Sequence, residues 1–257
     1  MVQTAMGAIP LKVSHQHIHA RYIVFDKDGT LIDFHKIWGP RLVRGALKLK
    51  EFCALGDDFL GHLYRALGYD PQSGQTFGQG PLATAPLHQF ATIVASVLFQ
   101  FGPNWDEACR LTRDYMSSEM TAAPSDDEII ARGSIRSAFE KLSQAGCLLG
   151  IATTDNRAAT ESAIARLGIG DLVMDIRCGD DNGPVKPDIA VLHQLAASRS
   201  LPLSELIMVG DTVSDLAMAK DAGVGLSVGI LGGAGSESQL RPYADVLIES
   251  VEEITPS

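Results

Sequence analysis

Short apolar runs alternate with helical segments through the second half of this chain, and this alternation limits the folds open to it. The apolar runs stand at residues 147–152, 173–177, 206–209, 224–228 and 246–248. Apolar residues at helical spacing fill the intervening segments: Ser134 to Gln144, a stretch through Ala159, Ala163 and Leu167, a stretch that Pro187 opens, and 212–222. Continuous apolar strands between helices are typical of a parallel sheet that is covered on both faces. We therefore expect an α/β fold.

A helical block interrupts this pattern directly after the first apolar run, Tyr22 to Phe25. From about residue 40 to 120 the apolar residues follow helical spacing, as in Leu60, Leu63, Tyr64 and Leu67. The stretch 69–86, rich in Gly, Pro and polar residues, predicts a long loop between two of these helices. We interpret the block as an inserted domain with boundaries near 34–40 and within 121–128. Residues 1–34 and 125–257 then form the α/β core, and residues 35–124 form a helical domain.

Composition and charge exclude several classes of protein. Apolar residues make up 46% of the chain and charged residues 20%, which excludes extensive disorder. The net charge of −10 comes without a basic stripe and argues against nucleic acid as a partner. No apolar run approaches the roughly 20 residues of a membrane span, and the first residues show no secretory signal pattern. Four scattered cysteines without a CxxC pair indicate free thiols in a reducing compartment, so we expect a cytoplasmic protein with no membrane partner.

Two acidic clusters follow predicted strands. Asp26 and Asp28 stand directly after the first apolar run, and their spacing turns both toward the same side of an extended backbone. Asp211 and Asp215 follow another run, and their spacing of four lets both lie on one face of a helical turn. At the carboxyl ends of parallel strands these groups would meet in the crevice where ligands bind. Carboxylates at close range repel one another unless a cation lies between them, and ligands that are all oxygens suit Mg²⁺. Taken alone, Asp28-Gly29 would also fit a solvated turn.

Four segments in order resemble the motifs of the haloacid dehalogenase superfamily, and of its phosphatase branch in particular. The first motif is similar to VFDKDGTLID, and the second is similar to LLGIATT, with Thr153 as its hydroxyl residue. The third motif is similar to VKPD, which contains Lys186, and the fourth is similar to GDTVSD. The similarity covers residues 21–33 and about 133–230. The long insertion between the first two motifs resembles members with a helical cap, such as phosphoglycolate phosphatases and β-phosphoglucomutase. The resemblance implies a Rossmann-like parallel sheet core with an inserted α-helical cap domain.

The resemblance also implies an activity: a phosphatase that hydrolyses small phosphomonoesters through an aspartyl-phosphate intermediate, with Mg²⁺ as cofactor. Asp26 is the expected nucleophile, because a carboxylate is ionised at neutral pH and needs no base to activate it. Asp28 is the expected general acid and base. Thr153 and Lys186 are expected to be catalytic by binding phosphoryl oxygens, where the ammonium group offsets negative charge. Thr154 is included among the expected substrate-binding residues.

For the metal, the resemblance implies Asp26, the backbone carbonyl of Asp28, Asp211 and Asp215, the last directly or through water. Asp28 also sets the chain apart from dehalogenases and phosphonate hydrolases, which lack an acid at this place. The expected substrate is a small phosphorylated metabolite, for example phosphoglycolate or a sugar phosphate, and the expected assembly is a monomer or a homodimer. Two other functions stay open, a phosphomutase of the same superfamily and a non-catalytic binding protein on the same fold.

Other features favour simpler interpretations. Lys27 is expected to point away from both of its acidic neighbours, as in an extended strand. His15, His17 and His19 alternate, but without acidic or cysteine partners they favour a polar strand or tail over a metal site. The glycine-rich stretch 229–235 lacks GxGxxG and predicts a loop rather than a nucleotide cradle.

Substrate specificity is expected to come from residues that face the site across the crevice between the core and the helical insert. Cationic groups that follow the first motif would attract an anionic substrate, and the candidates are His35, Lys36, Arg41 and Arg44. The stretch 72–86 offers backbone N–H groups near Gly80, where a ligand can approach closely. The alternative interpretation is a hinge surface and a solvated helix face.

Overall fold

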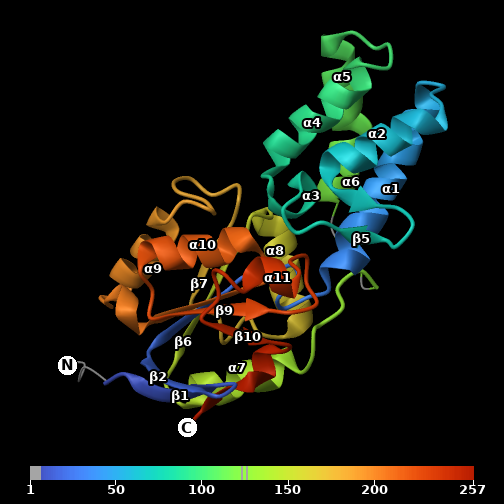
Figure 1. The fold of residues 1–257 in the computed structure, drawn as a ribbon. Coiled ribbons are helices and arrows are strands. Elements are labelled where there is room, and N and C mark those ends of the chain that lie inside the picture. Colours follow the sequence, from blue (N-terminus) through green and yellow to red (C-terminus); the bar gives the residue numbers. More distant parts are fainter. Residues whose placement is uncertain (1–6, 123, 126) are drawn as a thin grey trace.

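The computed structural model describes residues 7–122, 124–125 and 127–257 (Figure 1). Residues 1–6, and two positions of the predicted junction at 121–128, lie outside the described residues. The described strands form a central six-stranded parallel sheet in the order β10-β9-β8-β3-β6-β7. Its strands are β3 (Tyr22–Phe25), β6 (Leu148–Ala152), β7 (Asp175–Arg177), β8 (Leu206–Gly210), β9 (Leu226–Ile230) and β10 (Val246–Ile248). The predicted α/β class with a parallel sheet is confirmed.

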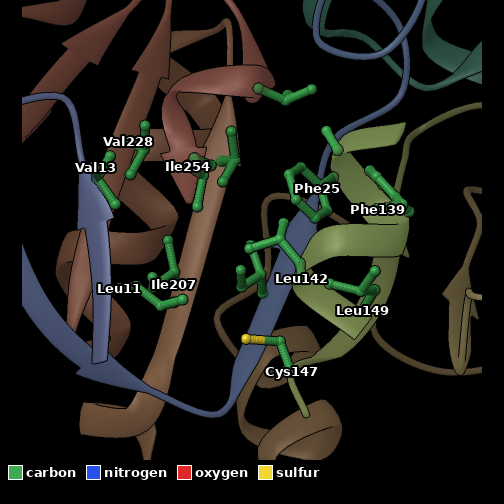
Figure 2. Close-up of a cluster of buried hydrophobic side chains, with 14 of the residues drawn as sticks. Leu11, Val13, Phe25, Phe139, Leu142, Cys147, Leu149, Ile207, Val228 and Ile254 are labelled. Atoms are coloured by element: carbon green, nitrogen blue, oxygen red, sulfur yellow. The ribbon is translucent and has the colours of Figure 1, made fainter. Parts of the chain in front are cut away.

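Helices follow the strands and cover both faces of this sheet. They are α7 (Ile135–Gln144), α8 (Arg157–Leu167), α9 (Ala190–Ser198), α10 (Val213–Ala222) and α11 (Glu237–Leu240), with short 3₁₀ turns η2 (Leu203–Glu205) and η3 (Val251–Glu253). On one face Phe25 of β3 packs with Phe139 and Leu142 of α7 (Figure 2). On the other face Val24 and Met208 pack against α9 and α10. Alternate residues of each strand thus enter opposite cores, which is why the strands appear as unbroken apolar runs in the sequence.

A second, antiparallel sheet was not predicted from the sequence. It has the order β11-β1-β2, with β1 (Ile9–Val13), β2 (Gln16–Ala20) and β11 (Ile254–Pro256). Leu11 and Val13 of β1 are fully buried and pack beside Ile207 and Val228 of the main sheet (Figure 2). The segment before the alternating histidines is therefore half apolar, because β1 buries every second residue. The alternating histidines belong to the exposed turn and strand β2, as the simpler interpretation expected.

The helical block after β3 gathers into one lobe beside the sheet (Figure 1). Its elements are α1 (Phe34–Phe52), α2 (Asp57–Leu67), β4 (Tyr69–Asp70), β5 (Gln75–Thr76), α3 (Pro81–Thr84), α4 (Leu87–Phe99), α5 (Trp105–Leu111), a π-helical turn η1 (Thr112–Ser117) and α6 (Ser118–Thr121). Their apolar faces enclose a separate core, which includes Leu42, Phe59, Val94 and Leu98. One residue of the α/β part, Ala234, joins this core. Within the described residues, no helix has the length and apolar character that a membrane crossing requires.

Four local predictions differ from the structure. Strand β7 begins at Asp175 rather than at residue 173, because the N–H groups of Leu172 and Val173 bond to the Ile169 carbonyl. The stretch 69–86 is not one loop, because β4 and β5 form a small antiparallel hairpin and α3 follows it. Helix α9 begins at Ala190 rather than at Pro187, because the chain first turns at Asp188, whose carboxylate accepts a hydrogen bond from the Ala190 N–H at 2.9 Å. Strand β9 begins at Leu226 rather than at residue 224, because the Gly225 N–H bonds to the carbonyls of Leu203 and Leu206.

Candidate active site

The predicted motifs meet at one edge of the central sheet. Asp26 follows β3, Thr153 follows β6 and Asp211 follows β8, and these three strands are neighbours in the order β8-β3-β6. The Asp26 N–H donates to the Val209 carbonyl at 2.8 Å, which continues the sheet ladder up to the acidic residue. Because parallel strands end at the same edge, residues far apart in the sequence come together there.

Three buried carboxylates form what we call the acidic cluster: Asp26, Asp211 and Asp215. Carboxylate oxygens of all three lie within 4.8 Å of one another. Lys186, from the segment before α9, pairs through its Nζ with Asp26 and with Asp215, and donates to the Ala152 carbonyl at 3.0 Å. One ammonium group therefore faces three carboxylates in a buried setting.

The electrostatics of the acidic cluster follow from this imbalance. Burial raises the pKa of Asp26 to about 7. The Lys186 ammonium acts to lower this pKa, but repulsion from Asp215 and Asp28 partly cancels that effect. Burial also raises the pKa of Asp211 well above its ordinary value, with further repulsion from Asp26 and Asp215. Burial opposes the charge of Lys186, but Asp215 and Asp26 outweigh it and raise the pKa of that ammonium. A set of clustered carboxylate oxygens with surplus negative charge fits a hard divalent cation such as Mg²⁺.

Glycines enclose Asp211 so closely that no larger residue fits beside it. A Cβ atom at Gly29 would lie 2.1 Å from Asp211 Oδ2, and one at Gly233 would lie 2.3 Å from the same oxygen. The Ala234 N–H donates to Oδ2 at 2.7 Å. The stretch 229–235 is thus a loop, as expected, and it also holds an acidic side chain in place, a role that the sequence reasoning missed. Its paired glycines directly after an apolar strand were the available signal.

The second acidic pair comes together differently from the prediction. Helix α10 begins at Val213 with Thr212 as its N-cap, so Asp211 stands before the helix and not on its first turn. Asp215 accepts a hydrogen bond from the Thr212 hydroxyl at 2.7 Å. It also forms an ion pair with Lys186. Asp211 and Asp215 still approach each other. Asp215 lies against the end of β8, since a Cβ atom at Gly210 would lie 2.5 Å from the Asp215 Cβ.

Lys27, Asp28 and Asp155 form a second buried group, the Lys27 triad, and here the prediction for Lys27 was wrong. Its Nζ lies 2.8 Å from a carboxylate oxygen of Asp28 and 2.8 Å from one of Asp155, and the Lys27 side chain is only 3% exposed. Strand alternation fails because β3 already ends at Phe25 and the chain turns, with Gly29 at φ +92°. Asp155 was missed by the sequence reasoning, although a buried lysine next to one acid implies a further partner.

Asp28 receives opposing influences within this group. Burial raises its pKa, and the repulsion of Asp155 adds to that, while the Lys27 ammonium and a hydrogen bond from the Trp38 side chain act in the opposite direction. The net result is a pKa above the ordinary value. Trp38 belongs to α1, so the helical lobe reaches the predicted acid directly.

A cleft of about 310 Å³ lies between the sheet edge and the helical lobe. Six predicted site residues line it: Asp26, Asp28, Thr153, Thr154, Lys186 and Asp215. Asp211 is fully buried behind this wall. The Thr153 hydroxyl accepts a hydrogen bond from the Asp155 N–H at 3.1 Å, so its own hydrogen is available to a ligand in the cleft.

The cationic candidates of the helical lobe lie elsewhere. Arg41 pairs with Glu128 at 2.8 Å and donates to the Met120 and Ala122 carbonyls. Arg44 pairs with Glu119 and Glu128. Neither arginine lines the cleft, nor do Lys36, which is exposed, or His35, whose Nε2 lies 3.1 Å from the Gly233 carbonyl oxygen. Gly80 packs against Gly68 and does not face the cleft. The alternative interpretation describes the exposed Lys36 and Arg44 better, whereas Arg41 fits neither interpretation because it is buried.

Comparison with known proteins agrees with this geometry. A family model for haloacid dehalogenase-like hydrolases matches residues 20–223, and the chain belongs to this family. A phosphoglycolate phosphatase of Rhodospirillum rubrum is 36% identical over 83 residues, which are 32% of this chain and 34% of that relative. One of Vibrio parahaemolyticus is 30% identical over 127 residues, 48% of this chain and 56% of that relative. The matches thus span between a third and a little over half of the curated relatives.

A solved structure extends the likeness to nearly the whole fold. A haloacid dehalogenase-like hydrolase from Bacteroides fragilis has a TM-score of 0.63 and 20% sequence identity, and the match covers 91% of this chain and 99% of that one. At this identity the comparison concerns the fold alone. The predicted resemblance to the superfamily is confirmed, and its phosphoglycolate phosphatase-like type is supported by the curated relatives.

Proposed function

We propose that the protein is a Mg²⁺-dependent phosphatase that hydrolyses small phosphomonoesters through a phosphorylated Asp26. The observation that carries this proposal is the meeting of Asp26 with a buried ammonium group and two further carboxylates at the wall of the cleft. Membership of the hydrolase family and similarity to phosphoglycolate phosphatases support it. The proposal includes residues 35–124 as a cap domain and the predicted cytoplasmic location.

The acidic cluster and the backbone carbonyl of Asp28 would hold the Mg²⁺ ion. All of these donors are hard oxygens, which Mg²⁺ prefers over nitrogen or sulfur. When bound, the ion supplies positive charge that offsets the charge of the phosphoryl oxygens and of the attacking carboxylate. The surplus negative charge of the cluster is the structural reason to expect an ion there, independent of the family.

The side chains on the cleft wall divide the chemistry among them. The Lys186 ammonium and the Thr153 hydroxyl bind phosphoryl oxygens, which orients the phosphorus toward Asp26. An Asp26 oxygen forms a bond to phosphorus as the ester P–O bond breaks, and Asp28 gives its proton to the departing oxygen. Asp28 then takes a proton from water, whose oxygen attacks phosphorus, so that inorganic phosphate leaves and the Asp26 carboxylate is restored.

The other functions have less support. A phosphomutase would have to shield phosphorylated Asp26 from water, and nothing in the described part of the chain favours such shielding. A non-catalytic binding protein would not need Asp28 next to a nucleophile, a buried lysine and an acidic cluster. The expected monomer or homodimer and the absence of a nucleic-acid partner stay predictions.

The experiment is phosphate release from p-nitrophenyl phosphate by the full chain, with Mg²⁺ and with EDTA. We expect activity with Mg²⁺, loss with EDTA and recovery on adding Mg²⁺. Asp26→Asn should lower kcat by about a thousandfold or more, because an amide is a poor nucleophile of nearly the same shape. Asp106→Asn, an exposed site on α5, is the matched control and should not change kcat. Activity of Asp26→Asn near that of the wild type would refute the proposal.

A further inference from the structure

We propose that the substrate's leaving group is an uncharged, largely apolar alcohol, and not a carboxylate-bearing or polyhydroxy group. This inference rests on the phosphatase activity proposed above and concerns which phosphomonoester the cleft accepts. It differs from the expectation of phosphoglycolate or a sugar phosphate, the first of which has the support of the curated relatives. Three properties of the cleft wall support it: its apolar side chains, the distribution of its charges, and the hydrogen bonds that its hydroxyl groups already donate to the backbone.

The wall opposite the sheet edge is mostly apolar. It is built from Phe34 and Trp38 of α1, Leu82 of α3, Leu87 and Phe90 of α4, and Met120 of α6. The two aromatic rings of α1 lie with their centroids 6.5 Å apart. Trp38 lies close to Asp28, the predicted acid for the leaving group, and both residues line the cleft. The departing oxygen therefore leaves next to an aromatic ring, and the rest of the leaving group extends toward apolar side chains.

The charges on the cleft wall are unfavourable for a carboxylate in the substrate. On the core side Asp180 contributes an acidic group to the lining, and so do Asp28 and Asp155, which share the Lys27 ammonium between them. Among the described residues that line the cleft, the basic side chains are Lys186 and His88. Lys186 is paired with two carboxylates and faces the phosphoryl position, while His88 is exposed beside Leu87. A second anionic group on the substrate would meet repulsion without a matching partner.

A polyhydroxy leaving group would find no free hydroxyl donor among the described side chains that the helical lobe contributes to the lining. The hydroxyls that the helical lobe contributes to the lining are those of Thr84 and Thr121. Thr84 donates to the Gly80 carbonyl at 3.1 Å, and Thr121 donates to the Ser117 carbonyl at 2.8 Å. Burying sugar hydroxyls against apolar side chains without new partners costs free energy. An apolar group gains free energy from the same contact.

The size of the cleft limits the leaving group as well. Its volume of about 310 Å³ is at the lower end of the range of about 300–1,000 Å³ for small-molecule sites. A phosphoryl group with one aromatic ring or a short alkyl chain suits this space, whereas a folded phosphoprotein does not.

The test compares kcat/KM for three alkyl phosphates: 2-phenylethyl phosphate, phosphoglycolate and glucose 6-phosphate. We expect 2-phenylethyl phosphate to exceed both others by about tenfold or more, the scale on which a hydrophobic pocket discriminates. Leu87→Arg places a guanidinium at the exposed part of the wall and should raise kcat/KM for phosphoglycolate while lowering it for 2-phenylethyl phosphate. Leu47→Arg is the matched control, because Leu47 of α1 is exposed to a similar degree, 47% against 39% for Leu87, but does not line the cleft, and it should change neither value.

The outcomes separate this inference from the proposed function. A wild-type preference for phosphoglycolate or glucose 6-phosphate, with Asp26-dependent turnover, would overturn the inference and leave the phosphatase standing. No hydrolysis of any ester, p-nitrophenyl phosphate included, would refute the phosphatase and with it this inference. An equal effect of Leu87→Arg and Leu47→Arg would also overturn it.

Discussion

Glu128, in the segment that leaves the helical lobe, pairs with α1, the helix that enters it. Replacing Glu128 should lower the free energy of unfolding by an amount that depends on pH. Its carboxylate pairs with the buried Arg41 and with Arg44, both from α1, and accepts from the Ser125 N–H at 3.0 Å. Burial opposes its ionisation, but these hydrogen bonds lower its pKa from 4.5 to about 2. Glu128→Gln keeps the shape of the side chain and removes the charge that Arg41 requires.

The magnitude follows from the two pKa values. The difference between 4.5 and about 2 corresponds to about 3 kcal/mol, at 1.36 kcal/mol per pKa unit. Glu128 keeps 12% of its side chain exposed and one partner, Arg44, is 47% exposed, so screening by water reduces this to about 2 kcal/mol. Because the folded pKa lies below the unfolded one, the stabilisation is complete above pH 4.5 and is lost as the pH falls toward 2.

Urea unfolding at pH 7, 4 and 3 measures this contribution. We expect Glu128→Gln to lower the free energy of unfolding by about 2 kcal/mol at pH 7. The difference in free energy of unfolding between variant and wild type should become smaller at pH 4 and smaller again at pH 3. Glu119→Gln is the matched control, because its partners Arg44 and Lys48 are 47% and 52% exposed, and we expect a cost of about 0–1 kcal/mol. Equal losses in the two variants, or a gap that does not change with pH, would refute this reasoning.

Three further predictions concern the site. Asp211→Asn removes one of three buried carboxylates that repel one another, so the melting temperature in EDTA should not fall. The increase in melting temperature that Mg²⁺ gives the wild type should disappear in this variant, and an increase that persists would contradict the metal site. Gly233→Ala forces Asp211 to move and should weaken Mg²⁺ binding in calorimetry by about tenfold or more, whereas Gly170→Ala, which meets only an ordinary contact at 3.6 Å, should have no effect. Lys27→Met leaves Asp28 without its ammonium partner. We expect it to lower kcat more for alkyl phosphates than for p-nitrophenyl phosphate, because the nitrophenolate leaving group needs little protonation. Equal losses of kcat would argue against a role of Lys27 in leaving-group departure.

The central sheet and the placement of its motifs could be predicted because they depend on local patterns. A strand buried on both faces must be apolar throughout, and the runs around Val24, Leu149 and Val209 have this property. The first polar residue after such a run marks the strand end, which is where Asp26, Thr153 and Asp211 stand. No long-range information was needed, because parallel strands bring their carboxyl ends to one edge.

The small antiparallel sheet depends on a partner that the local pattern does not reveal. Residues 9–13 alternate apolar and polar side chains, but so short a stretch is also compatible with a tail. It becomes a strand because β11, from the far end of the chain, pairs with it, with Leu11 opposite Pro256. The same limit applies to the Lys27 triad, since Lys27 and Asp155 are 128 positions apart. The cleft wall of the helical lobe likewise joins α1, α3, α4 and α6, so its apolar character appears only in three dimensions.

The two buried ammonium groups divide the site into parts with different charge requirements. Lys186 faces the acidic cluster, where one positive charge stands against three carboxylates, and a divalent cation would bring this part to neutrality. The Lys27 triad holds one ammonium between two carboxylates, so a single proton is sufficient to neutralise it. A metal is thus favoured on the side of Asp26, which in the proposed mechanism is ionised when it attacks phosphorus. A proton is favoured on the side of Asp28, which in the same proposal gives one to the leaving group, and the separation of the two lysines keeps these requirements apart.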